Sequence, residues 1–385
     1  MLLLDPMSAW ALFADQVELW AAENITHETN LLRLSKNIDP ASVGAKQLGD
    51  IYNTTKLGAS ADIPVSLQHF QAAYTWQYTR YDNYSNLNFG GHLASLNWAW
   101  MIDHRFYGTL GAADSKTLAS FSNIQRNAQD LVTTRQAFAS GNWKVTPTWR
   151  GSGRLEWGKS EHSDELRSAN NIETVSGELA LAYLTREENT VAAVARAERG
   201  KRPSTIGPGP VPIDNTYRQT AMGATTAWAF TPHSRLDGSL FFVHRGYDAD
   251  TRRNFSGLTG RALYTWTPTM KITVVSAIYR DIGPAEDVTT SFVLATGAYV
   301  RPKWDITEKI SVQANAEYDR WEYRGDPILG GTFTHRLRTY GASIAYRPTR
   351  KSVVNAGYNR EVRVSDLFTG DYDAEIFFVE GRLGF

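Results

Sequence analysis

The sequence predicts an all-β protein: a transmembrane, antiparallel, up-and-down β-barrel of about 18 strands, with 16 strands as the alternative count. Three observations predict it. Apolar and polar residues alternate over long segments, short and long connections alternate along the chain, and the apolar faces tend to begin or end in Trp or Tyr. Because successive strand residues point to opposite faces, the alternation gives each strand one lipid-facing and one lumenal side. We therefore expect residues 15–385 to form a single barrel domain.

Composition excludes several other classes of protein. The mean hydropathy is negative, and no stretch approaches the roughly 18 apolar residues that a membrane-spanning helix needs. The 40 basic and 40 acidic residues balance, which argues against a nucleic-acid partner. Cys is absent, so the chain has no thiolate metal site and no Cys nucleophile.

The first residues differ in composition from the rest. Residues 1–14 are apolar and end in the small residue Ala14, but no Lys or Arg precedes Arg33. This pattern predicts the remnant of a secretory signal sequence, with a disordered leader as the alternative.

Turn signals recur with a spacing of roughly 40 residues, which a β-propeller of the WD type would also show. Longer polar stretches lie between the turns, such as 201–216 and 326–334. This alternation is typical of outer-membrane barrels, which have tight periplasmic turns and long external loops. The short turns are predicted at 146–148, 187–189, 231–233, 267–269, 307–309 and 348–350.

Strand length favours the barrel over the propeller. Between Ile310 and Asp319 every second residue is apolar, and roughly ten alternating residues match a tilted membrane strand. The same phase appears in 70–79, 149–157 and 174–183, and two less regular strands are predicted near 17–33 and 47–62. Four tryptophans of the apolar phase are expected in the membrane-interface girdles: Trp98, Trp100, Trp157 and Trp266.

The last predicted strand, 372–385, ends on Phe385, with Leu383, Val379 and Phe377 on the same face. It resembles the C-terminal signal by which bacterial outer-membrane barrels are recognised for insertion. The sequence therefore predicts the outer membrane of a Gram-negative bacterium, where lipids and lipopolysaccharide would be partners.

Four segments carry a family resemblance: 27–34, 81–89, 252–257 and 371–374. They resemble the EpsL-like outer-membrane proteins encoded with exopolysaccharide biosynthesis and PEP-CTERM/exosortase systems. The family usually has an acidic residue where this chain has Thr29. The resemblance implies a barrel that takes part in exopolysaccharide biosynthesis or export, with polysaccharide and periplasmic export or biosynthesis proteins as partners.

Candidate site residues are those expected on the inner face of the wall. Charges of both signs lining a wet lumen could hydrogen-bond to sugar hydroxyls, or could simply form cross-strand ion pairs that stiffen the wall. A tryptophan near an external loop could stack on a sugar ring. The candidates are Arg150, Arg154, Glu156, Glu178, Arg196, Glu198, Asp237, Arg245, Glu317, Asp319 and Trp321.

The sequence predicts no enzyme, no catalytic residues, no cofactor and no metal site. The eight His are scattered, and neither an HExxH nor a GxSxG motif occurs. Acidic segments at 161–165 and 371–373 could hold Ca²⁺, although solvated loops are the plainer interpretation. The predicted function is a polar conduit or guide for a secreted glycan. A long external loop such as 201–216 can fold inward as a plug of this conduit. The alternatives are a general diffusion porin and an outer-membrane enzyme acting on lipid or surface glycan.

Overall fold

The computed structural model describes residues 16–204, 214–284, 291–325 and 331–385. Within these ranges the chain forms one antiparallel sheet of 18 strands, in which each strand pairs with its neighbours in sequence. Strands β1 (Val17–Glu28) and β18 (Tyr372–Gly384) also pair with each other, which closes the sheet into a barrel. The predicted fold class and the count of 18 strands are confirmed. Residues 1–14, predicted to be a signal remnant, lie outside the described residues.

The other strands follow in chain order. They are β2 (Asp50–Val65), β3 (Gln68–Tyr81), β4 (Phe89–Met101), β5 (Phe106–Leu118), β6 (Leu131–Lys144), β7 (Trp149–His162), β8 (Ile172–Leu184), β9 (Thr190–Lys201), β10 (Tyr217–Thr231), β11 (Ser234–Tyr247), β12 (Phe255–Thr269), β13 (Ile272–Pro284), β14 (Phe292–Asp305), β15 (Ile310–Arg324), β16 (Phe333–Thr349) and β17 (Ser352–Ser365). The long connections carry the short helices η1 (Pro40–Val43), η2 (Ser85–Leu87), α2 (Phe121–Ile124), η3 (Glu165–Asn170) and η4 (Thr251–Arg253).

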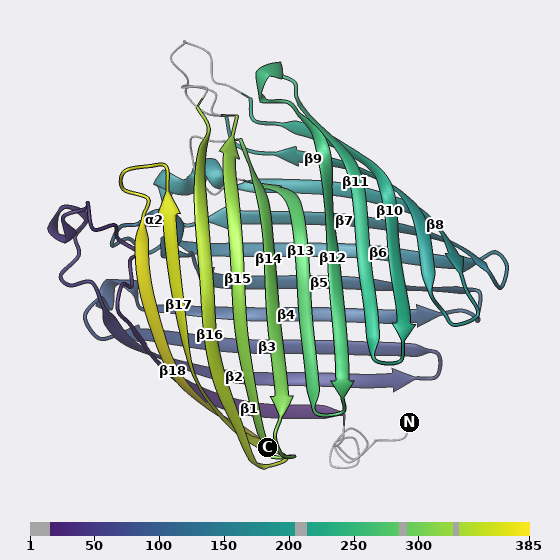
Figure 1. The fold of residues 1–385 in the computed structure, drawn as a ribbon, viewed down its shortest axis with the longest axis horizontal. Coiled ribbons are helices and arrows are strands. Elements are labelled where there is room, and N and C mark those ends of the chain that lie inside the picture. The colour runs from purple at the N-terminus through teal and green to yellow at the C-terminus, as the bar shows by residue number, and fades with distance from the viewer. Residues whose placement is uncertain (1–15, 205–213, 285–290, 326–330) are drawn as a thin grey trace, which may run out of the picture.

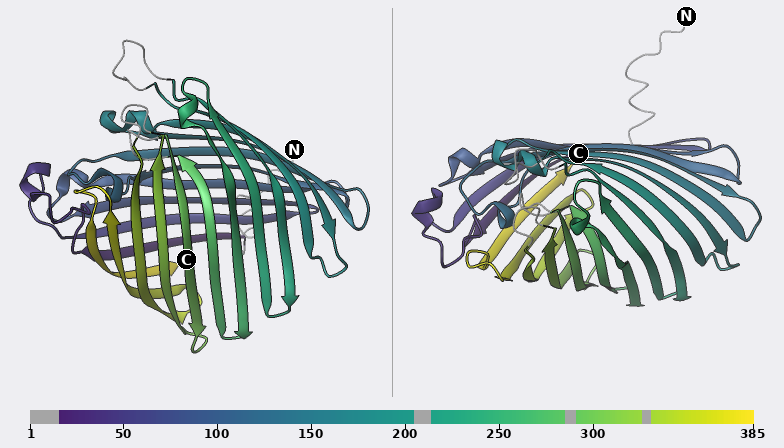
Figure 2. Two further views of the ribbon diagram at one scale, coloured as in Figure 1. Left: turned by 45° about the horizontal axis from the view of Figure 1, so that its top comes forward. Right: turned by 90° about the horizontal axis from the view of Figure 1, so that it is seen from above.

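The barrel is not a round cylinder. In Figure 1 the purple and blue strands β1–β7 run behind the green and yellow strands β12–β18 and cross them, and the wall turns between these two parts at β8–β11. Figure 2 shows the same turn from two other directions. Short turns join the strands at one end of the wall, and the long loops lie at the other end. Within the described residues, no helix is long and apolar enough to cross a membrane.

The outward face of the wall is apolar. Residues paired across neighbouring strands point to the same side, so the register follows this face around the barrel. It carries exposed apolar side chains such as Leu155 on β7, Leu179 on β8 and Leu240 on β11. This surface has the character of a lipid-facing band. Tryptophans on the same face include Trp98, Trp100, Trp149, Trp157, Trp266 and Trp304.

Four predicted boundaries are wrong. Strand β1 ends at Glu28, five residues before Arg33, and β2 starts at Asp50 instead of 47. Strands β12 and β16 run through Pro268 and Pro348, where we expected turns. Each proline falls inside a register shift of the ladder, so its missing N–H leaves no paired position unsatisfied.

One carboxylate lies on the outward face at the seam that closes the barrel. Glu23 on β1 pairs with Gly381 on β18 and with Thr55 on β2. Its Oε1 accepts a hydrogen bond of 2.9 Å from the side-chain amide of Asn53. Since Val379 and Leu57 flank it on the neighbouring strands, Glu23 is a charged group in an otherwise lipid-facing surface.

Candidate functional site in the lumen

Five of the predicted residues meet on the inner face of β7–β9. The register places Arg154 beside Glu178, and Glu178 beside Arg196. Glu156 lies on the same face, two residues along β7 from Arg154. With Glu198 of β9 they line a cavity of about 420 Å³, and Gln219 of β10 completes its wall.

The two cations of this cavity are held in place. Arg196 donates to the Glu178 carboxylate through Nε, and its guanidinium lies 4.2 Å from the ring centre of Phe241. Arg154 donates twice to Glu156 Oε2, at 3.0 and 2.9 Å, and lies 3.9 Å above the Phe138 ring. A guanidinium fixed between a carboxylate and an aromatic face keeps its charge at one place in the lumen.

Arg245 on β11 lies just beyond the cavity and is 2% exposed. Its Nε donates to Gln219 Oε1 at 2.9 Å, and its guanidinium lies 4.1 Å from the Tyr217 ring centre. The Tyr217 hydroxyl donates to Glu198 at 2.7 Å, so one network links β9, β10 and β11. Sequence reasoning missed Tyr217 and Gln219, because an uncharged inward residue has no signal beyond its phase.

The other predicted residues lie elsewhere in the lumen. Arg150, near the short turns, donates to the Tyr107 hydroxyl at 3.4 Å. Asp237 accepts from Arg235 at 2.9 and 3.1 Å, close to the turn that precedes β11. These two residues do not reach the cavity, and their ion-pair and hydrogen-bond partners belong to the wall itself.

A second group of predicted residues lies on β15, facing β13. The Tyr279 hydroxyl donates to the carboxylate of Asp319 and, at 3.4 Å, to Glu317. Arg301 of β14 pairs with Glu317 at 3.0 Å. Trp321 follows on the same face and is half-buried. The predicted residues thus form separate groups on opposite parts of the wall.

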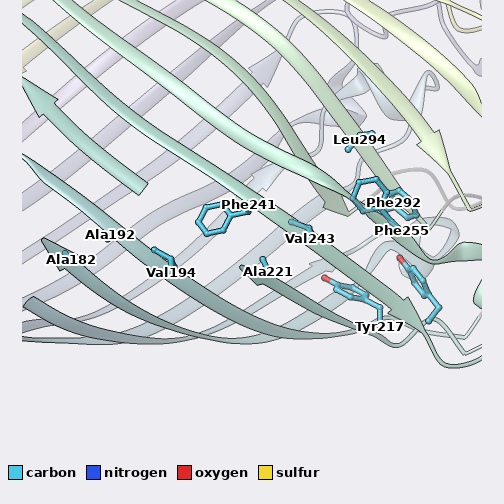
Figure 3. Packing of buried hydrophobic residues seen from close by; sticks show 11 residues of the cluster. Ala182, Ala192, Val194, Tyr217, Ala221, Phe241, Val243, Phe255, Phe292 and Leu294 are labelled. Carbon is cyan, nitrogen blue, oxygen red and sulfur yellow. The ribbon is translucent and has the colours of Figure 1, made fainter. Parts of the chain in front are cut away.

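The lumen is less polar than the sequence predicts. Where the wall turns, inward side chains of β9–β11 such as Val194, Ala221, Phe241 and Val243 are buried against one another (Figure 3). Sharp curvature brings inward side chains together, so this part of the inner wall packs like a small core. This apolar part of the lining was not predicted from the sequence.

The first long loop folds against the inner wall at the external end. Leu31, Leu32 and Leu34 are buried with Tyr84 and Phe121 in one cluster, which we call the mouth cluster. The strand predicted near 17–33 includes Leu31 and Leu32. Instead Arg33 has a left-handed backbone, with φ 55°, which turns the chain into the mouth.

The loop that contains α2 also reaches across the mouth. Arg363, on the inner face of β17, donates to the backbone carbonyl of Ser122 in α2. Five strands stand between β5 and β17 around the wall, so this contact spans the opening of the barrel. Gln125 adds a hydrogen bond of 2.7 Å to the carbonyl of Arg33. The two loops together cover part of the external mouth.

A third set of loop contacts lies on the opposite side of the mouth. Arg202 donates to Asn170 at 3.1 Å, and Arg253 donates to Ser291 at 2.6 Å and to Asn215 at 2.8 Å. Burial lowers the pKa of Arg202 and that of Arg253 below their ordinary values. These contacts bind four long loops together. Of the predicted plug 201–216, residues 205–213 lie outside the described residues.

Acidic groups form pairs where they were considered as cation ligands. Glu161 pairs with Lys159 at 2.8 Å, and Asp373 with Arg360 at 2.7 Å. Among the described residues, no group of three or more His, Asp or Glu side chains is arranged to hold a metal ion.

Comparisons with known proteins agree with the architecture. A protein-family model described as "Putative beta-barrel porin 2" matches residues 229–385, which span β11–β18. A search of curated protein sequences finds no match.

Three solved structures illustrate the likeness of fold. OccK1 (OpdK) of Pseudomonas aeruginosa is 11% identical, with 97% of this chain and 100% of that chain covered and a TM-score of 0.52. OccK2 (OpdF) of the same organism is 10% identical, with 97% and 99% covered and a TM-score of 0.52. OccAB3 of Acinetobacter baumannii is 9% identical, with 97% and 100% covered and a TM-score of 0.50. At such identities the likeness shows the fold.

The closed wall, its apolar outer face and the porin-family match together define an outer-membrane β-barrel protein with a porin-like fold. Its location is the outer membrane of a Gram-negative bacterium, as the sequence predicts.

Proposed function

We propose that this protein is a general diffusion channel that passes small hydrophilic solutes. The observation that carries the proposal is the lumenal cavity of about 420 Å³, in which fixed cations and carboxylates face the same space. Both signs of charge on a pore wall let polar solutes exchange hydration for wall contacts without trapping either anions or cations. The porin-family match supports this function over catalysis.

The loop contacts at the mouth favour a small solute over a polymer. The loop carrying Arg33 and the loop carrying α2 are anchored to β17 and cover part of the opening. Small solutes can pass beside such loops, whereas a polymer needs a wide, continuous path. A pore for small solutes therefore agrees better with the loop contacts.

A polysaccharide conduit is the second candidate, because segments such as 252–257 resemble the EpsL-like family. In that function, Trp321 and the lumenal charges would contact sugar rings and hydroxyls. The comparisons give this function no support, so we rank it below diffusion.

Permeation into liposomes tests the proposal. Proteoliposomes containing the purified barrel should admit neutral sugars up to a size limit, and planar bilayers should show steady ion conductance. Replacing Arg154 and Arg196 with Gln should shift the reversal potential in a salt gradient toward cation selectivity, because two fixed positive charges leave the wall. As a matched control, Arg135→Gln on the outward face should leave selectivity unchanged.

Failure has a distinct signature. Proteoliposomes that admit no solute and bilayers that show no current would contradict the diffusion channel. A deletion strain that loses secreted polysaccharide, combined with a non-conducting barrel, would instead favour the second candidate.

A further inference from the structure

A long groove crosses the outward face of β11–β16. Two adjoining hollows, each of about 720 Å³, share the residues Ala262, Ile278, Ala298 and Tyr318. These four residues form one row of the register across β12–β15, so the hollows are parts of a single groove. The surface lies within the lipid-facing side of the wall, and its lining is mostly apolar away from the external end.

Side-chain size explains the groove. Small residues on neighbouring strands, Gly260, Ala262, Ala298 and Ala316, form its floor. Larger side chains such as Tyr340 rise at its sides. Hydrocarbon chains can lie along such a floor, where van der Waals packing against the small residues holds them.

The external end of the groove is basic. Arg280 on β13 and Arg320 on β15 are paired with the same residue of β14, Thr296, and Arg338 on β16 is paired with Tyr318. All three arginines line the groove. Arg320 lies 3.2 Å from Glu322, and Arg280 donates to the Thr296 hydroxyl at 3.1 Å. Among the described residues, no carboxylate forms an ion pair with Arg280 or Arg338.

The outward face of β5–β7 is different. There Arg135 lies 3.0 Å from Asp114 and 3.8 Å from Glu161, and Lys159 lies 2.8 Å from Glu161. These cations are neutralised within the protein. Other outward-facing cations, such as Lys116 and Arg199, also have no carboxylate partner among the described residues. The groove differs from their surroundings because its two unpaired arginines adjoin an apolar hollow.

We propose that this groove binds lipid A, the phosphorylated glycolipid of the outer leaflet. Its acyl chains would lie on the Gly260–Ala316 floor, and a phosphate of its headgroup would accept hydrogen bonds from Arg280 and Arg338. Guanidinium groups bind phosphate oxygens through paired, charge-assisted hydrogen bonds, which are stronger than neutral ones. The combination of several acyl chains with phosphate distinguishes lipid A from an ordinary phospholipid. Binding at this outward site is independent of conduction through the lumen.

Native mass spectrometry of the delipidated barrel in mild detergent, titrated with diphosphorylated lipid A, tests the site. We expect saturable binding that falls at least about tenfold in the Arg280→Gln/Arg338→Gln variant, since charge-assisted bonds are lost. Ala298→Phe, which fills the floor, should weaken binding similarly. The matched controls are Arg135→Gln/Lys159→Gln for the basic end and Ala139→Phe for the floor, and both should bind like the unaltered protein.

Two further ligands show whether binding requires the phosphates of lipid A and whether an ordinary anionic phospholipid can replace it. Lipid A without its phosphates and phosphatidylglycerol should each bind more weakly than diphosphorylated lipid A. Equal binding of phosphatidylglycerol, or equal loss in the β5–β7 controls, would overturn the proposal. Unchanged lipid A binding in the Arg280→Gln/Arg338→Gln variant would overturn it as well.

Discussion

The guanidinium of Arg33, in the first external loop, lies 2.9 Å from the carboxylate of Glu361 on the inner face of β17. The same guanidinium pairs with Glu28 at the end of β1. Burial alone would lower the pKa of Arg33, but these carboxylates outweigh it and hold that pKa above its ordinary value. Arg33 therefore stays charged and ties the loop to two parts of the wall.

Removing the ion pairs of Arg33 should widen the external opening of the lumen. We expect Arg33→Gln to raise the single-channel conductance in planar bilayers, because the loop loses its ion pairs with Glu28 and Glu361. Arg252→Gln is the matched control, since Arg252 pairs with Asp250 in an exposed loop. Equal conductance in Arg33→Gln and the unaltered protein would show that the loop does not limit the current.

Gly297 on β14 lies against Tyr279 of β13 and Asp319 of β15. A Cβ there would come within 2.5 Å of an Asp319 carboxylate oxygen and 2.7 Å of the Tyr279 ring. Gly297→Ala should therefore reduce the free energy of unfolding by about 1–3 kcal/mol, as overpacking does elsewhere. Urea unfolding in lipid vesicles measures it. Gly151→Ala, where a Cβ would meet nothing within 4 Å, should show almost no change.

The assignment of faces can be tested on one strand. Ala314→Arg should cost about 2–4 kcal/mol, because it would put a cation into the lipid-facing band. Gln313→Arg points into the lumen, beside Lys303 and Ser343, and should be tolerated. The yield of folded barrel, read as the heat-modifiable band on gels, reports both. Equal damage from the two substitutions would contradict the face assignment.

The carboxylate at the seam leads to a stabilising substitution. Glu23→Leu should raise the free energy of unfolding in vesicles by about 1 kcal/mol, since a charged group leaves a lipid-facing surface. Glu23→Gln, which keeps a hydrogen-bond acceptor for Asn53, should lie between the two. A loss of stability in Glu23→Leu would show that the bond to Asn53 is needed to hold β1 against β2.

The strands could be predicted because lipid and water enforce the period of two. The alternation from Ile310 to Tyr318, for example, gives the correct outward face of β15. The first loop could not be predicted in this way. Leu31 and Leu32 look like a continued strand, but they are buried by contacts with residues far along the chain.

The sequence predicts which face of its strand each candidate residue occupies. It does not predict which of these residues lie side by side. Alternation indicated that Arg154 and Arg196 face inward, while their partners depend on which strands lie side by side and on ring contacts such as Phe241. The apolar part of the lumen escaped prediction for a related reason. Curvature of the wall at β8–β11 decides whether an inward Val or Ala is wet or buried, and no local pattern encodes curvature.

The pairing of β1 with β18 has a consequence for assembly. Until the last strand arrives, both edges of the growing sheet expose unpaired N–H and C=O groups, which neither lipid nor another part of the wall can satisfy. An intermediate that lacks β18 would be an open sheet with two unpaired edges, and such edges are prone to aggregate. We therefore expect the sheet to become stable in the membrane only when its two terminal strands join.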